Sequence, residues 1–291
     1  MAAEIIYKGA VIAAPEGGQT ATLKCKGMVM EDDVVVTATG GTADNDQLIG
    51  LIERSAAEFT APDGLEKIGD YAFSNYYSLV SVSLPDSVQS IGGYAFDNCQ
   101  NLALISLPVG LKSIGANAFN GCSSLTLASL PAALTSIGWY AFSGCSKLAL
   151  TSLPEALETI GAYSFKGCTK LALASIPAGV KKIEKYAFYD CFRLTLKSLP
   201  DALTYIGDYA FYNCQGLALA SIPAGVTWIG SYAFCECSGL ETITFDGKPY
   251  SIAYNAFSDC DNLTTINVPW AEGEVANAPW GARYATINYA K

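Results

Sequence analysis

Residues 83–102 read SLPDSVQSIGGYAFDNCQNL, and this stretch recurs along most of the chain with a constant step of 23 residues. Its isoleucine stands in nine copies, at Ile68, Ile91, Ile114, Ile137, Ile160, Ile183, Ile206, Ile229 and Ile252. A fixed period without insertions is the signature of a solenoid, in which each unit stacks only on its neighbours. We therefore expect one elongated stack of nine coils, numbered 1 to 9 by these isoleucines.

Two further columns of the repeat are apolar in all nine copies. One column is Phe73, Phe96, Phe119, Phe142, Phe165, Phe188, Phe211, Phe234 and Phe257. The other is Leu79, Leu102, Leu125, Leu148, Leu171, Leu194, Leu217, Leu240 and Leu263. Alanine precedes the phenylalanine except in coil 5, where Ser164 stands. A large ring beside a small residue, once per coil, predicts the layers of the core.

Two columns indicate corners of the coil. Glu184 and Ala253 replace the glycine of the Ile-Gly pair, so that corner does not require a positive φ. The column before the cysteine is mostly Asn, Asp or Gly, which tolerate left-handed backbone, with Glu236 as the exception. We expect a left-handed corner at Asn75, Asn98, Gly121, Gly144, Gly167, Asp190, Asn213, Glu236 and Asp259.

The pattern L-P-x-x-L-x-x-I-G-x-x-A-F-x-x-C-x-x-L, from Ala61 to Pro269, resembles the BspA-like leucine-rich repeats. These occur in surface proteins of bacteria and some protozoa and in some bacteriophage proteins. The resemblance implies a leucine-rich repeat solenoid with one short strand per coil in a parallel sheet. It also implies a role in adhesion or recognition, and no catalytic residue.

The repeat divides the chain into four parts. Residues 1–44 read as a small β module of short Ile-, Val- and Thr-rich strands. Residues 45–60 are a capping helix and lead-in, because Leu48, Leu51 and Ile52 fall on one helical face. The solenoid occupies 61–269, and 270–291 form a C-terminal cap that Trp270 and Trp280 help to seal. Solenoids need such caps to stay soluble.

Charge and composition exclude several functions. The formal net charge is −10, without a basic run, so a nucleic-acid backbone would be repelled. No apolar run approaches the length of a membrane span, and the first residues lack a signal-peptide pattern. The chain has no histidine, and it shows no phosphate loop and no paired-carboxylate motif. We expect no enzyme activity, no metal and no cofactor.

Eight of the ten cysteines share one column of the repeat. They are Cys99, Cys122, Cys145, Cys168, Cys191, Cys214, Cys237 and Cys260. Tyr76 takes this position in coil 1, which a packing column tolerates and a disulfide framework does not. We expect a ladder of reduced, structural thiols, with disulfides between coils as the alternative. Cys25 and Cys235 lie outside the column and are the two to test for reactivity.

Recognition residues are sought in the variable columns, because the invariant ones build the core. Aromatic side chains interrupt otherwise polar columns in coils 6 to 8, and Trp139 is an outlier. Aromatic residues are enriched at binding hot spots, so we predict a ligand-binding patch for a glycan or protein at Tyr189, Phe192, Tyr205, Tyr212 and Trp228. The alternative is that these are ordinary, partly buried surface aromatics. The regular tyrosine column from Tyr71 to Tyr232 is interpreted as structural stacking.

The segment L-A-L-A-S-L-P departs from the family pattern. In the family's register its leucines would point outward as an oligomer interface, and Lys197 would point inward. A shift of the strand by one residue exchanges the two faces and avoids a buried lysine. We favour the shift, which buries Leu104, Leu127, Leu150, Leu173, Leu196 and Leu219.

Both ends of the chain resemble tail-associated proteins of bacteriophages that infect gut bacteria. The stretches are EIIYKGAVIAAPEGGQTATLKCKG and VPWAEGEVANAPWGARYATINYAK. This resemblance implies a virion protein that folds in the bacterial cytoplasm, binds a bacterial surface glycan or protein, contacts other virion proteins and forms a homotrimer. A bacterial cell-surface adhesin that binds host matrix or mucin is the alternative, and a spacer that binds nothing is the third.

Overall fold

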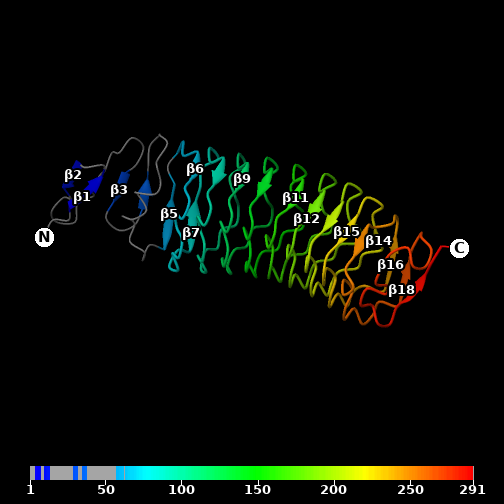
Figure 1. Ribbon diagram of the computed structural model, residues 1–291. Coiled ribbons are helices and arrows are strands. Elements are labelled where there is room, and N and C mark those ends of the chain that lie inside the picture. Colours follow the sequence, from blue (N-terminus) through cyan, green and yellow to red (C-terminus); the bar gives the residue numbers. More distant parts are fainter. Residues whose placement is uncertain are drawn as a thin grey trace.

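The structure is a computed structural model. It describes the backbone of residues 4–7, 10–13, 29–31 and 35–37, and residues 57–61 and 63–290 in full. The coils stack along one long axis, from β5 (Glu58–Thr60) to β18 (Thr265–Asn267) (Figure 1). None of the described residues is helical. The helix expected within 45–60 and Cys25 lie outside the described residues.

Four strands are described in the part of the chain before the solenoid. They are β1 (Glu4–Tyr7), β2 (Ala10–Ala13), β3 (Val29–Glu31) and β4 (Val35–Thr37). β1 pairs with β2 and β3 pairs with β4, both antiparallel. These strands fall within the predicted β module at residues 1–44.

Each of the nine coils contributes a two-residue strand that ends on its isoleucine. The first four are β6 (Lys67–Ile68), β8 (Ser90–Ile91), β9 (Ser113–Ile114) and β10 (Ser136–Ile137). The other five are β11 (Thr159–Ile160), β12 (Lys182–Ile183), β13 (Tyr205–Ile206), β15 (Trp228–Ile229) and β17 (Ser251–Ile252). All pairs are parallel and in register one period apart. The isoleucine points into the core, and the residue before it points to solvent on what we call the short-strand face.

The short-strand face is divided into two sheets, β10-β9-β8-β6 and β11-β12-β13-β15-β17. Within each sheet the residue after the isoleucine donates to the isoleucine carbonyl one coil earlier, as Gly138 N does to Ile114 O at 2.9 Å. In the described chain this bond is absent at Ile137, which is 8% exposed, against 1% for Ile114 and Ile160. Coils 4 and 5 remain joined elsewhere, since Phe142 N donates to Ser164 O at 2.8 Å.

A second row of strands is present only near the two ends of the solenoid. It consists of β5 and β7 (Ser81–Ser83), and of β14 (Ser221–Ile222), β16 (Thr242–Phe245), β18 and β19 (Thr286–Asn288). Between β7 and β14 the L-A-L-A-S segments form no strand, yet their leucines are at most 7% exposed and Lys197 is exposed. The predicted inward orientation of these leucines and outward orientation of Lys197 are therefore confirmed. The alternative of an exposed leucine stripe is wrong.

The core consists of layers, one per coil. The nine phenylalanines are at most 2% exposed, and successive rings from Phe73 to Phe257 stack with centroids 5.1–5.6 Å apart. The nine leucines of the second apolar column are buried beside them. The predicted core columns are confirmed.

The coils have left-handed backbone at two corners. The predicted left-handed corner is confirmed in all nine coils, with φ of 56–74° from Asn75 to Asp259. A second left-handed corner was not predicted. It lies at the tyrosine column, where Tyr71, Tyr94, Asn117, Tyr140, Tyr163, Tyr186, Tyr209 and Tyr232 have φ of 54–60°. Bulky residues rarely adopt this conformation, and here ring stacking accompanies it.

The eight cysteines of the column are free thiols inside the core. Each Sγ donates to the carbonyl oxygen of a phenylalanine in the preceding coil, at 2.9–3.1 Å. Cys235 is also free and buried, and burial first, then Asp259, raise its pKa to about 12. A reactive cysteine needs an accessible thiolate, so Cys235 does not meet this requirement.

The stacking continues past coil 9 into a tenth, irregular coil. Phe257 N donates to Trp280 O at 2.9 Å, and β19 pairs in parallel with β18. Trp280 and Trp270 are buried at 0% and 3% exposure, and their rings lie 6.0 and 5.3 Å from that of Phe245. The two tryptophans thus cover the last phenylalanine layer.

Candidate functional site

The structure brings two of the five predicted binding residues together. The rings of Tyr189 and Tyr212 stack with centroids 4.6 Å apart and planes 7° apart. Each also contacts the tyrosine three positions earlier, since Tyr186 lies 5.4 Å from Tyr189 and Tyr209 lies 5.8 Å from Tyr212. Two columns of tyrosine therefore run side by side over coils 6 and 7.

The regular tyrosine column extends this surface in both directions. Tyr163 stacks on Tyr186 at 4.6 Å, Tyr186 on Tyr209 at 4.6 Å, and Tyr209 on Tyr232 at 5.0 Å. We call the resulting surface the tyrosine platform, formed by Tyr163, Tyr186, Tyr189, Tyr209, Tyr212 and Tyr232. All six side chains are half-buried. Sequence reasoning treated the regular column as structural only, and it missed the three-residue spacing that places Tyr186 beside Tyr189 and Tyr209 beside Tyr212.

Stacking decides what the platform presents to a partner. Inside a stacked column each ring face is covered by the next ring, so ring edges and hydroxyl groups are what remain accessible. Burial raises the pKa of Tyr186, Tyr189 and Tyr209. The Tyr212 hydroxyl donates to Glu236 Oε1, and this bond, then burial, raise its pKa further. The hydroxyls of Tyr186, Tyr189 and Tyr209 therefore stay protonated at neutral pH and can both donate and accept hydrogen bonds. The Tyr212 hydroxyl already donates its proton to Glu236 and can only accept.

Charged side chains border the tyrosine platform. Lys166 Nζ lies 5.2 Å from the ring centroid of Tyr189 and 5.9 Å from that of Tyr163. Lys185 Nζ lies 5.8 Å from the Tyr163 ring centroid. These are cation–π distances. In coil 8, Glu236 accepts a hydrogen bond from the Tyr212 hydroxyl.

The other three predicted residues lie apart from this pair. Tyr205 and Trp228 are partners on the adjacent strands β13 and β15, on the short-strand face, and Trp228 is 41% exposed. Phe192 is 37% exposed and follows the left-handed corner at Asp190. In the described chain, the ring contacts of Tyr189 and Tyr212 run to the tyrosine column and not to these three. Ring contacts therefore join two of the five residues, and the binding of a ligand by all five stays a prediction.

Other chemistry is not assembled in the described residues. No three His, Cys, Asp or Glu side chains of this part lie close enough to hold a metal ion. A search of the same residues for a helix long and apolar enough to cross a membrane found none. What the described surface offers is a half-buried array of aromatic rings and hydroxyls.

The stacked coils, the buried ladders and the exposed variable columns define a leucine-rich repeat solenoid. A family model described as the BspA type leucine-rich repeat region matches residues 53–172 and 158–275. The chain belongs to the BspA-type leucine-rich repeat family. Leucine-rich repeat solenoids are typically scaffolds that bind other molecules on an extended surface.

Solved structures agree with this assignment. A leucine-rich repeat protein from T. pallidum is 32% identical, with a TM-score of 0.50, and the match covers 63% of this chain and 83% of that one. A leucine-rich repeat protein from Bacteroides ovatus has a TM-score of 0.56 at 23% identity, covering 91% and 76%, and shows the shared fold. The search of curated proteins found no match. Residues 1–52 and 276–291 lie outside the family match, so the phage-like character of the two ends stays a prediction.

Proposed function

We propose that the protein is a non-catalytic recognition protein that binds a surface glycan or protein through the tyrosine platform. The observation that supports this most is the pairing of two stacked tyrosine columns over coils 6 and 7. Tyrosine combines a large apolar ring with a hydrogen-bonding hydroxyl and loses little entropy on binding. A row of such side chains, held rigid by stacking, suits a partner rich in hydroxyl and amide groups.

The biological setting has two candidates. A bacterial cell-surface adhesin is favoured by the family, because BspA-like repeats occur in bacterial surface proteins. A bacteriophage tail protein is favoured only by the resemblance of the two ends, and it carries the further proposals of a homotrimer and of contacts to other virion proteins. Both settings use the solenoid in the same way, as a rigid carrier of a recognition surface.

Binding to intact cells separates these settings. The labelled, purified chain is applied to a panel of intact gut bacteria and, in parallel, to host matrix proteins and mucin. Strain-selective labelling of bacteria is the result expected of a phage receptor-binding protein, and labelling of matrix or mucin is that expected of an adhesin. Binding to neither would leave a structural spacer. Light scattering on the same sample measures whether the chain is a trimer.

The platform itself is tested with substitutions that the repeat already tolerates. Ser74, Ser143 and Ser258 occupy the column of Tyr189 and Tyr212 in other coils. The double variant Tyr189→Ser/Tyr212→Ser should therefore keep its fold and lose about tenfold or more in affinity, as expected for two hot-spot aromatics. Its matched control is Tyr77→Ala/Tyr250→Ala, which removes two tyrosines that are 54% and 89% exposed outside the platform. Equal binding by the two variants would refute the platform.

A further inference from the structure

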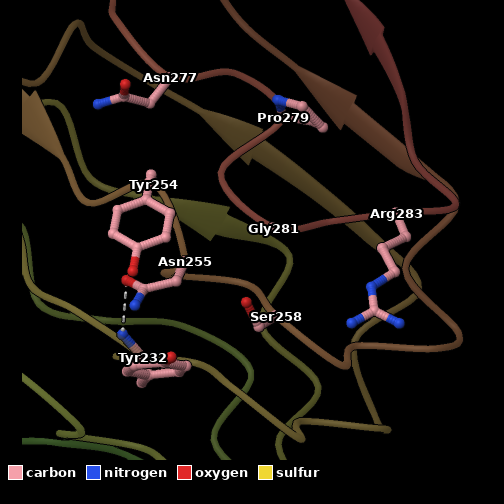
Figure 2. Close-up of a pocket in the computed structure, with 8 residues that line it drawn as sticks. All are labelled: Tyr232, Tyr254, Asn255, Ser258, Asn277, Pro279, Gly281 and Arg283. Carbon is pink, nitrogen blue, oxygen red and sulfur yellow. Dashed lines mark hydrogen bonds between the residues drawn. The ribbon is translucent and has the colours of Figure 1, made fainter.

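A pocket of about 440 Å³ lies where coil 9 meets the C-terminal cap, a volume typical of small-molecule sites. Figure 2 shows Tyr232 and Tyr254 on one side of the pocket and Arg283 on the other, with Ser258 and Gly281 between them. The complete lining is Tyr232, Tyr254, Asn255, Ser258, Asn277, Pro279, Gly281 and Arg283. It is open to solvent, since Tyr254, Asn277 and Arg283 are exposed.

The pocket exists because the tyrosine column ends there. Asn255 takes the position of the next tyrosine, and it is 5% exposed with its side chain turned inward. In the preceding coil Tyr209 N donates to the backbone carbonyl of Ser231 at 2.8 Å. Tyr232 N instead donates to the side-chain oxygen of Asn255, at 3.4 Å (Figure 2). Asn255 thus replaces a backbone acceptor and supplies no ring to cover Tyr232.

Tyr232 is the last tyrosine of the regular column, and in the described chain only one of its ring faces is stacked on another ring. Its first face stacks on Tyr209 at 5.0 Å. Its second face has no stacking partner in the described chain, and Tyr232 lines the pocket. Inside the column such faces are covered, so this is where a flat or ring-shaped ligand can continue the stack. Tyr254, 67% exposed, adds a second aromatic wall.

Polar groups surround the free ring. Asn277, Ser258 and the Tyr254 hydroxyl can each donate and accept hydrogen bonds. Arg283 contributes a planar group with several N–H donors, and its Nη2 lies 3.4 Å from Asp259 Oδ1. The ion pair balances the charge of the guanidinium, so the pocket has no excess positive charge.

We propose that this pocket binds a neutral sugar residue at the end of a glycan. The apolar face of a pyranose ring stacks on aromatic rings, and its hydroxyls match the donors and acceptors around the pocket. Because Asp259 pairs with Arg283, the arginine offers no uncompensated positive charge to a carboxylated sugar, which makes a neutral sugar the better match. The proposal rests on the recognition function proposed above, and it adds a site and a ligand class separate from the central coils of the platform.

The experiment is a titration of the full chain, followed by two-dimensional NMR, with six free sugars. Galactose, mannose, fucose and N-acetylglucosamine are the neutral probes, and glucuronic acid and N-acetylneuraminic acid are the acidic ones. At least one neutral sugar is expected to shift the side-chain amides of Asn255 and Asn277 and the Arg283 guanidinium signal. No shift with any of the six would overturn the proposal, and a response confined to the two acids would overturn the neutral ligand class.

The chain offers a matched pair of variants. Tyr254 and Trp139 occupy the same column of the repeat, five coils apart, and both are 67% exposed. Tyr254→Ala should weaken sugar binding about tenfold, as expected for loss of a stacking ring, and Trp139→Ala should leave it unchanged. Arg283→Gln should also weaken it without changing the fold, because Arg283 is exposed. Equal effects of Tyr254→Ala and Trp139→Ala would refute the pocket.

The two proposals can fail separately. If cell binding is lost in Tyr189→Ser/Tyr212→Ser while no sugar binds the pocket, the platform stands and the sugar site is wrong. If a sugar binds the parent protein but not Tyr254→Ala, and Tyr189→Ser/Tyr212→Ser binds cells as the parent does, the sugar site stands and the platform is wrong.

Discussion

Cys191 Sγ lies 3.1 Å from the carbonyl oxygen of Phe165 in the preceding coil and donates a hydrogen bond to it. The same oxygen accepts from Cys168 N at 3.1 Å, so both of its lone pairs are used. The arrangement repeats in eight coils. A buried carbonyl needs a partner, and cysteine is a small apolar residue that also supplies a donor. This accounts for cysteine at a corner where serine or alanine would fit by size.

Replacement of one ladder cysteine should therefore cost stability. Cys191→Ala removes the donor and leaves a small cavity, and we expect a loss of about 1–2 kcal/mol in the free energy of unfolding. The measurement is urea denaturation followed by circular dichroism. Cys235→Ser is the control, because serine occupies that column in other coils and Cys235 lies outside the ladder. If the control loses as much as Cys191→Ala, the thiol–carbonyl bond is not the cause.

Stability should fall steeply at alkaline pH. Burial raises the pKa of Cys99 and Cys260 to about 12 from the usual value of 9.0. The unfolded chain therefore loses these protons at lower pH than the folded one. The stabilisation is complete below about pH 9 and is lost as the pH rises towards 12, with a limiting slope of about 1.4 kcal/mol per pH unit for each thiol.

Urea midpoints measured between pH 7 and 11 check this prediction. Tyrosines ionise in the same range, so the comparison is with Cys99→Ala/Cys260→Ala, whose stability should fall less steeply above pH 9. Iodoacetamide should leave the native ladder unmodified at pH 8, because a thiol without accessible thiolate does not react. Rapid labelling of the folded protein, or identical slopes in the two proteins, would contradict the account.

Ser164 is a site where the protein should gain stability by mutation. It replaces the alanine of the repeat, is 0% exposed, and its hydroxyl has no hydrogen-bond partner in the described chain. Ser164→Ala should stabilise the fold by about 1–2 kcal/mol, because a buried unsatisfied hydroxyl is removed. The reverse change in the next coil, Ala187→Ser, should destabilise by a similar amount. Thermal unfolding of the two variants decides, and a destabilised Ser164→Ala would show that the hydroxyl has a partner.

The repeat made most of the fold predictable. The columns of Phe96 and Leu102 recur in all nine coils, and that of Cys99 recurs in eight. The structure of one coil therefore predicts that of the others. The leucine register was decided by one residue, because burying Lys197 costs more than shifting a strand by one position. Where a column is uniform, the sequence pattern and physical chemistry predict the same position for its side chains.

What could not be predicted lies where the repeat deviates or where contacts depend on orientation. Nothing in a tyrosine residue indicates a left-handed φ, because the stacking that accompanies it forms only between folded coils. The tenth coil was missed because its tryptophan, Trp280, stands where the other coils have phenylalanine. The pocket at Asn255 depends on that irregular coil and on an amide that turns inward. Neither feature can be predicted from the repeating columns. The missing hydrogen bond at Ile137, which divides the short-strand face into two sheets, has no counterpart in the sequence pattern.

The tyrosine column allows the left-handed corner to be tested against the stacking. Tyr209 has φ of 56° and stacks on Tyr186 and Tyr232 at 4.6 and 5.0 Å. Both Tyr209→Ala and Tyr209→Gly lose the stacking, which is worth about 0.5–1.5 kcal/mol for an aromatic pair. Only glycine is free of the left-handed penalty of roughly 1–2 kcal/mol. Tyr209→Gly should therefore be the more stable variant by about 1 kcal/mol.

This order is opposite to that in regular structure, where glycine is the less stable of the two. Urea denaturation of both variants, with Tyr209→Phe to keep the stacked ring and remove only the hydroxyl, measures it. Tyr209→Phe should remain close to the parent protein, because the ring and not the hydroxyl makes the contacts with Tyr186 and Tyr232. An alanine variant as stable as the glycine variant would mean that the corner changes its backbone conformation once the rings are gone, and that stacking alone maintains the left-handed tyrosines.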